Sequence, residues 1–121
     1  MGTRAVYTFI DASQRHSVYK HWDGDPAAAC RFIANAQALA WPLPRFEADE
    51  FAAAFVAANK SQAGNIRLTT GPDAHGDLSF VYEIRCQDGR LHVRIYRCSG
   101  EARPLFDGTL EDAQQFAATF N

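Results

Sequence analysis

The chain has 121 residues, of which 47% are hydrophobic, and its 14 acidic and 12 basic residues give a formal net charge of −2. This length and composition are typical of one domain with one hydrophobic core, so we expect a single domain over residues 1–121. The composition excludes an intrinsically disordered chain and a collagen-like repeat. The nearly balanced charge disfavours binding to duplex nucleic acid or to an anionic membrane surface.

Cysteine usage and the apolar runs bear on the cellular compartment. Cys30, Cys86 and Cys98 are odd in number and none lies in a C-x-x-C motif, which favours free thiols in a reducing compartment. The longest apolar run, residues 51–58, is far shorter than the ~18 residues that a membrane span requires. The first residues lack the apolar segment of a signal peptide. We therefore expect a cytoplasmic protein without a membrane segment.

A hairpin and a helix are predicted at the start of the chain. Residues 4–11 and 16–22 are rich in β-branched and aromatic residues and are separated by a short loop. Gly24 suits a sharp turn after the second strand, and Asp25 suits the N-cap of a helix that begins with proline. Apolar residues at helical spacing predict this helix over residues 26–39.

A second helix and a third strand follow. The helix is predicted over residues 47–59, because acidic residues crowd its first turn and Phe51, Phe55 and Ala58 form an apolar stripe. Its many alanines indicate close packing against a neighbouring element. Residues 66–70 then have the composition of a short strand.

The strongest local signal is the Asp88-Gly89 pair between residues 78–87 and 90–98. Asp-Gly favours a type I′ turn, whose two central residues both have positive φ, so it predicts a two-residue hairpin with a fixed register. The core face then pairs Cys86 with Leu91, Ile84 with Val93, Tyr82 with Ile95, and Phe80 with Arg97. The wetter face pairs Arg85 with His92, Glu83 with Arg94, and Val81 with Tyr96.

The chain ends with a predicted strand and helix. A short strand is expected over residues 104–107, and Thr109 with Asp112 approximates a capping box for the last helix. That helix has an inner stripe of Leu110, Ala113, Ala117 and Phe120. The order ββααβββ(β)α predicts an α+β fold, in which an antiparallel sheet built from two hairpins is covered by about three helices.

The N-terminal segment RAVYTFID, followed by VYKHWDGDP and an alanine-rich helix, resembles a group of small uncharacterised proteins of phages and prophage regions. The pattern of that group is RATYxF, followed by HWDGYPxG leading into a helix. The chain departs from it at Asp25, where the pattern has Tyr, and at Ala27 and Ala28, where a Gly is expected nearby. The resemblance implies a viral or mobile-element setting and supplies no activity.

One candidate site is the turn His21-Trp22-Asp23 at the end of the second strand. A turn that leads into a helix can hold catalytic or phosphate-binding groups, because helix N-termini offer free N–H donors. The structural interpretation is that Trp22 packs against the helix while Asp23 or Asp25 caps it. Two aspartates would also repel a phosphate, so we favour the structural interpretation.

A second candidate is the loop that carries Asp73, His75 and Asp77. One histidine and two carboxylates could ligate a cation, but Asp and Gly are also typical of a solvated turn, and no fourth ligand follows in the sequence. Cys86 is predicted to face the core and Cys30 to pack in the first helix, so neither thiol suggests a nucleophile. We therefore expect no catalytic residues, no metal and no cofactor.

The third candidate is the polar face of the second hairpin, which carries Arg85, Arg90, His92, Arg94 and Tyr96 with Glu83 as its only acid. Arginines beside an aromatic residue can bind phosphate groups or stack on bases. A solvated sheet face, or one covered by another helix or subunit, has the same pattern. Because arginine is enriched at contact surfaces, we expect this face to be one.

Together these features favour a non-catalytic binding module of phage or prophage origin that contacts a host or viral protein. The alternatives are a small hydrolase that uses the His21/Asp23 turn or the Asp73/His75/Asp77 loop, and a nucleotide or nucleic-acid binder that uses the Arg85/Arg94 face. A homodimer is also expected, because two hairpins leave strand edges available for pairing.

Overall fold

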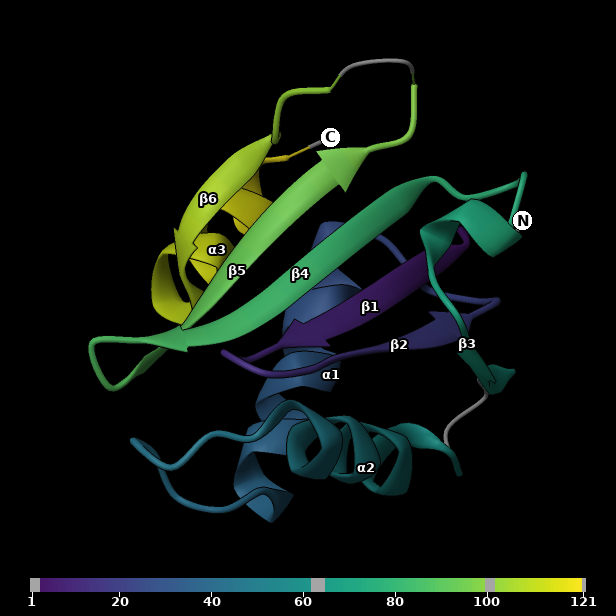
Figure 1. Cartoon of the computed structure of the whole chain (residues 1–121). Coiled ribbons are helices and arrows are strands. Elements are labelled where there is room, and N and C mark those ends of the chain that lie inside the picture. The colour runs from purple at the N-terminus through teal and green to yellow at the C-terminus, as the bar shows by residue number, and fades with distance from the viewer. Residues whose placement is uncertain (1–2, 62–64, 100–101, 121) are drawn as a thin grey trace.

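The computed structural model describes residues 3–61, 65–99 and 102–120, and it confirms an α+β fold (Figure 1). Six strands form one sheet in the order β3-β2-β1-β4-β5-β6. The strands are β1 (Ala5–Ile10), β2 (Arg15–Lys20), β3 (Ile66–Thr69), β4 (Phe80–Gln87), β5 (Arg90–Arg97) and β6 (Phe106–Thr109). The helices are α1 (Pro26–Leu39), α2 (Ala48–Asn59) and α3 (Leu110–Thr119), with a single 3-10 turn η1 (Pro72–Ala74).

The centre of the sheet is a parallel pair. β1 runs alongside β4 in the same direction, with Tyr7 opposite Tyr82 and Thr8 opposite Glu83. The other neighbouring strands are antiparallel, and the two predicted hairpins are β1–β2 and β4–β5. The sheet is therefore mixed rather than wholly antiparallel, because the chain returns through two helices and β3 before it adds β4 beside β1.

The register of the second hairpin is as predicted. Asp88 and Gly89 have φ of 54° and 74°, which is the type I′ conformation expected for this pair. Each pairing predicted for its two faces is present, from Phe80 opposite Arg97 to Cys86 opposite Leu91.

The strand before the last helix lies two residues later than predicted. Pro104 has no N–H to donate to a ladder, the N–H of Leu105 donates to the Ile95 carbonyl at 2.6 Å, and the paired register with β5 starts at Phe106. Thr109 ends this strand opposite His92 and also caps α3, where its hydroxyl accepts a hydrogen bond from the N–H of Asp112 at 3.2 Å. One residue therefore closes the sheet and starts the helix.

The core lies between the sheet and the helices, and aromatic rings fill its centre. Tyr7 of β1 stacks on Tyr82 of β4 with ring centroids 5.0 Å apart, and it contacts Phe55 of α2 at 4.6 Å. Phe9 contacts Phe51 at 5.5 Å on the same side. All five side chains are buried, so these aromatic contacts join α2 to the two central strands.

The three cysteines are free. Cys30 is buried in α1, and burial raises the pKa of its thiol to about 11. Cys98 is exposed, and Cys86, which was predicted to face the core, is half-exposed near the hairpin end, where its Sγ lies 3.9 Å from the Pro44 carbonyl. In the described part of the chain, no helix is long and apolar enough to cross a membrane.

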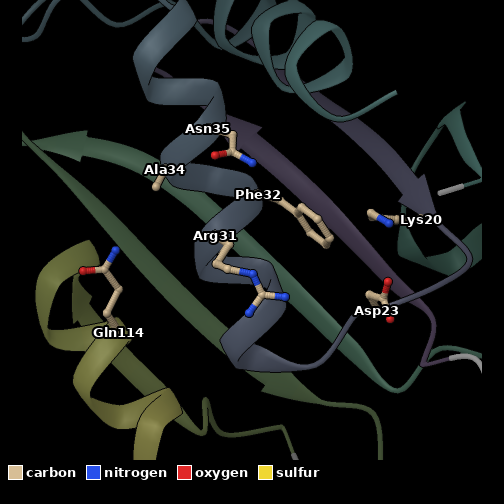
Figure 2. A pocket seen from close by; sticks show the side chains of 7 residues that line it. All are labelled: Lys20, Asp23, Arg31, Phe32, Ala34, Asn35 and Gln114. Atoms are coloured by element: carbon tan, nitrogen blue, oxygen red, sulfur yellow. The ribbon is translucent and has the colours of Figure 1, made fainter. Parts of the chain in front are cut away.

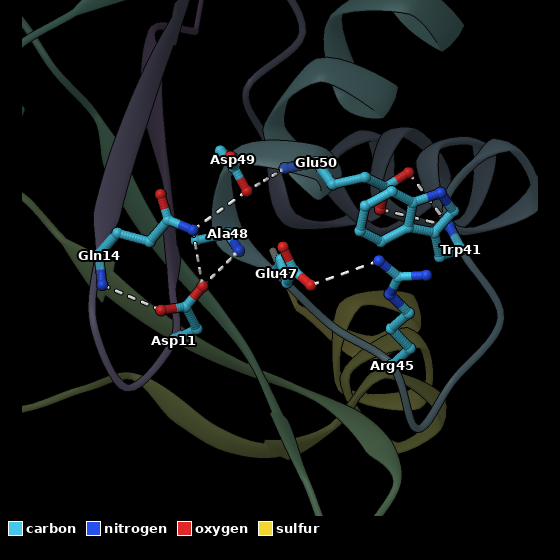
Figure 3. A network of polar contacts seen from close by, with 8 residues as sticks. All are labelled: Asp11, Gln14, Trp41, Arg45, Glu47, Ala48, Asp49 and Glu50. Atoms are coloured by element: carbon cyan, nitrogen blue, oxygen red, sulfur yellow. Dashed lines mark hydrogen bonds and ion pairs between the residues drawn. The ribbon is translucent and has the colours of Figure 1, made fainter.

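The start of α2 is capped by a residue from the first hairpin (Figure 3). Glu47, the N-cap residue, makes no side-chain cap bond, and a carboxylate oxygen of Asp11 accepts the N–H of Ala48 at 2.7 Å instead. The other Asp11 oxygen accepts the N–H groups of Ser13 at 2.8 Å and Gln14 at 2.9 Å. These hydrogen bonds, that from Ala48 first, hold the pKa of Asp11 well below its usual range.

The connection between α1 and α2 is held to the same helix end (Figure 3). The backbone N–H of Trp41 donates to the Glu50 carboxylate at 3.2 Å, and Arg45 pairs with Glu47 at 3.6 Å. The Arg45 guanidinium also lies 3.6 Å from the centre of the Trp41 ring, a cation–π contact. This connection is therefore ordered by contacts with the first turn of α2.

We expect Asp11→Ala to lower the free energy of unfolding at neutral pH, because the Ala48 N–H loses its acceptor. The pKa of the Asp11 carboxyl is lower in the native state than in the unfolded state. Its contribution to stability is therefore complete above the unfolded pKa of about 3.9 and is lost as the pH falls towards the native pKa. Urea unfolding of the parent and Asp11→Ala at descending pH should therefore give converging stabilities. Asp88→Asn, in a turn that suits Asn equally, is the control. A stability difference that stays constant down to pH ~2 would contradict the assignment.

Candidate functional site

The side of the sheet away from the helices, which we call the open face, carries a polar row across all six strands. Because the register is continuous, one residue from each strand falls into this row. In strand order from β3 to β6 the row is Thr69, Ser17, Thr8, Glu83, Arg94 and Asp107. Hydroxyl groups thus occupy the β3 end of this row, and charged groups occupy the β6 end.

The segment of residues 70–79 between β3 and β4, which we call the strap, crosses the β1–β2 half of the open face (Figure 1). His75 of the strap stacks on Tyr19 of β2 with ring centroids 4.3 Å apart and planes 12° apart. Its Nε2 is hydrogen-bonded to the Thr69 hydroxyl at 2.7 Å. The strap is therefore fastened to two strands, and the β4–β6 half of the face is left uncovered by any described helix or strap residue.

The candidate turn His21-Trp22-Asp23 divides between the two sides of the sheet. The ring of His21 is hydrogen-bonded to the Tyr19 hydroxyl at 2.9 Å and receives a hydrogen bond from Arg4 at 3.4 Å. Trp22 contacts His21 edge-on and is 42% exposed, so it does not pack into the helix layer as the structural interpretation expected. Asp23 instead lines a pocket beside α1, and the turn does not form one cluster.

The three residues of the candidate loop site, Asp73, His75 and Asp77, also make separate contacts. Asp77 pairs with Arg4 at 3.0 Å, His75 stacks on Tyr19, and Asp73 lines a cavity beneath the strap. The described residues include no group of three or more His, Cys, Asp or Glu side chains placed to hold a metal ion. His75 and the turn residue His21 are brought to the same tyrosine, a proximity that the sequence did not indicate.

Gly24 lies in the turn before α1, as predicted. The residue with positive φ in this turn is Asp23, at 57°, and not Gly24. Gly24 is required by close approach, because a Cβ there would lie 2.6 Å from the Thr3 carbonyl oxygen and 2.8 Å from the Ala5 Cβ. Its N–H donates to the same Thr3 oxygen at 2.8 Å, which ties the turn to the beginning of β1.

The arginines of the open face surround a single glutamate. Glu83 receives ion pairs from Arg85 at 3.2 Å, from Arg15 at 3.7 Å and from Arg94 at 3.8 Å. Arg15 comes from β2 and was missed in the sequence, although the alternation of Arg15 with Ser17 could have placed it on this face. Three guanidinium groups therefore converge on one carboxylate.

Glu83 is the only acid on this face of the second hairpin, as predicted, but β6 and α3 bring two more carboxylates to it. β6 places Asp107 opposite Arg94, and the two side chains pair at 3.1 Å. Arg90 pairs at 3.6 Å with Glu111, in the first turn of α3. The hydroxyl group of the neighbouring Tyr96 contributes most to raising the pKa of Arg94. Asp107 raises this pKa further, whereas desolvation lowers it.

The remaining residues of the predicted contact face lie where the register places them. His92 is half-buried on the open face opposite Arg85, and Tyr96 is half-buried opposite Val81. Together with Arg85, Arg90 and Arg94 they form one continuous surface on β4 and β5.

A cavity of about 260 Å³ lies between the strap and the open face. Thr8 and Ser17 line it from the sheet and are hydrogen-bonded to each other at 2.9 Å, while Arg15 and Glu83 also line it. Residues 70–74 complete its lining from the strap. The cavity is therefore continuous with the arginine cluster.

Compared with family models, with curated proteins and with solved structures, the chain matches none of them. Function is therefore inferred from the residues of the open face.

We expect Gly24→Ala to destabilise the fold by roughly 1–3 kcal/mol, because the added methyl group meets the Thr3 carbonyl oxygen and the Ala5 Cβ. Thermal unfolding followed by circular dichroism measures the effect. Asp23→Asn is the matched control, since asparagine tolerates a positive φ and the adjacent position has no such contact. Equal melting temperatures for Gly24→Ala and the parent would refute the close approach.

Proposed function

We propose that the chain is a non-catalytic binding module that contacts an acidic surface of a host or viral protein through the open face. The observation that carries this proposal is the convergence of Arg15, Arg85 and Arg94 on Glu83, beside the strap cavity and on the side of the sheet away from the described helices. Arginine is enriched at protein interfaces, where its planar guanidinium group binds carboxylates in two-point contacts.

The charge balance of this cluster favours an acidic partner. Three guanidinium groups face two carboxylates, Glu83 and Asp107, so positive charge is in excess. The side chains of Arg85 and Arg94 are 33% exposed and that of Arg15 is 61% exposed. Exposed ion pairs of this kind are worth only ~0–1 kcal/mol, so a partner's carboxylates can replace or extend them at little cost.

The setting is part of the same proposal. The resemblance of the N-terminal segment to phage and prophage proteins supports a viral or mobile-element origin. The free cysteines are in keeping with a reducing cytoplasm.

The alternatives have less support from the described geometry. A hydrolase based on His21 would need a free ring nitrogen, whereas this ring is already bonded to Tyr19 and Arg4. The raised pKa of Cys30 disfavours a thiolate nucleophile. Pairing of the arginines with carboxylates, in a chain of net charge −2, weakens the case for a nucleic-acid surface.

Binding of a fluorescent oligo-glutamate peptide tests the proposal. We expect binding to weaken as salt rises, and to weaken several-fold further in Arg85→Gln and Arg94→Gln, because each variant removes one guanidinium group from the cluster. Fluorescence anisotropy gives the dissociation constants. Arg45→Gln, which removes an arginine paired with Glu47 beside Trp41, is the control and should bind as the parent does.

Two results would overturn this proposal. One is peptide binding that Arg85→Gln and Arg94→Gln leave unchanged. The other is tighter binding of a single-stranded oligonucleotide than of the peptide with the same dependence on Arg85 and Arg94, which would assign the face to nucleic acid.

We also propose that the chain forms a homodimer through β3. This strand is an edge of the sheet, and its Leu68 is 82% exposed beside a groove that Val18, Ala52 and Val56 help to line. In an antiparallel ladder, every second residue directs its N–H and C=O groups towards the partner strand. The His21 N–H donates to the Asn65 carbonyl, so Asn65 faces β2, and the backbone groups of Ile66 and Leu68 face the open edge. Pairing with a second β3 would satisfy those groups and cover Leu68.

Sedimentation analysis of the parent and of Leu68→Lys tests the dimer. We expect a concentration-dependent dimer for the parent and a shift to monomer for Leu68→Lys, since a charge on an edge strand blocks pairing. Leu39→Lys changes another exposed leucine, at the end of α1, and should leave the dimer intact. A parent that stays monomeric at high micromolar concentration would refute this interface.

A further inference from the structure

A pocket of about 380 Å³ lies over α1, on the helix side of the sheet and away from the open face (Figure 2). Its volume is in the range of small-molecule sites, ~300–1,000 Å³. It is lined by Lys20 at the end of β2, by Asp23, by Arg31, Phe32, Ala34 and Asn35 of α1, and by Gln114 of α3.

Lys20 is the unusual member of this lining because it is a buried cation. The residue is 1% exposed, and no described carboxylate lies within 4.0 Å of its ammonium group. The ammonium donates one hydrogen bond, to the Trp22 carbonyl at 3.0 Å, and lies 4.3 Å from the centre of the Phe32 ring. An ammonium group has three N–H donors, and a buried charge is stabilised by pairing, so this group is suited to bind an anion.

The pKa of Lys20 agrees with this environment. Burial lowers it from its ordinary value, and the negative charge of Asp23 opposes that shift without forming an ion pair. An anion brought next to the ammonium would favour its charged form.

Arg31 supplies a second cation to the same pocket. It forms no ion pair with any described carboxylate within 4.0 Å. Figure 2 shows its guanidinium group on one side of the Phe32 ring and Lys20 on the other. Two positive groups thus flank an aromatic wall, and Asp23 provides only one negative charge in return.

We propose that this pocket binds a small molecule through an anionic oxygen group, a carboxylate or a phosphate, that is held by the Lys20 ammonium and attracted by the positive charge of Arg31. The Phe32 ring provides an apolar surface for the rest of the ligand, and the Gln114 amide provides a polar group from the facing helix. This site is separate from the arginine cluster of the open face, so its test does not depend on the proposed binding function.

Inorganic phosphate and acetate are suitable probes, titrated by calorimetry at constant ionic strength with chloride as the balancing anion. We expect binding of at least one of them, and loss of binding in Lys20→Met, which keeps a long unbranched side chain but removes the charge. Arg31→Gln should bind several-fold more weakly, because one positive charge is removed from the pocket. Preference for phosphate would indicate a phosphorylated ligand, and preference for acetate a carboxylic acid.

Two further variants make the test decisive. Asp23→Asn keeps a residue suited to positive φ and removes the repelling charge, so it should bind the anion more tightly than the parent. Lys60→Met removes a lysine from the end of α2 and should bind as the parent does. Should Lys20→Met fail to fold, Arg31→Gln and Asp23→Asn carry the test. Absence of binding, or binding that none of the pocket variants alters, would overturn the proposal.

Discussion

The parallel pairing of β1 with β4 joins two antiparallel halves, β3-β2-β1 and β4-β5-β6, into one sheet. On the helix side, this pair brings Tyr7 against Tyr82 at the centre of the aromatic core. On the open face, it places Thr8 opposite Glu83, so that Arg15 of the first half reaches a carboxylate of the second. Neither the core nor the arginine cluster exists in either half alone.

The two sides of this sheet present positive charge in different ways. On the open face, guanidinium groups lie half-exposed among carboxylates, and such pairs exchange partners at small cost. On the helix side, Lys20 is buried against Phe32 with a carbonyl as its only hydrogen-bond acceptor among the described residues. A broad, adaptable surface suits a protein partner, whereas an enclosed cation suits a small anion.

Features determined by neighbouring residues could be predicted from the sequence, and those determined by distant residues could not. Asp88-Gly89 fixes its hairpin register through the local demand for positive φ, and Asp25 caps α1 within its own turn. By contrast, Asp107 joins Arg94 only because β6 adds to the edge of β5. Lys20 is buried only because α1 packs over it, and nothing in the local pattern distinguishes it from an exposed strand lysine.

The cap that Asp11 provides for α2 also constrains the order in which the molecule assembles. An isolated helix of 12 residues is marginal in water, and the acceptor for its first N–H lies 37 residues earlier in the chain. The first turn of α2 is therefore completed only when the β1–β2 loop has closed and the two segments have met. Hairpin and helix thus become one cooperative unit, in which opening of the loop and fraying of the helix end are the same event.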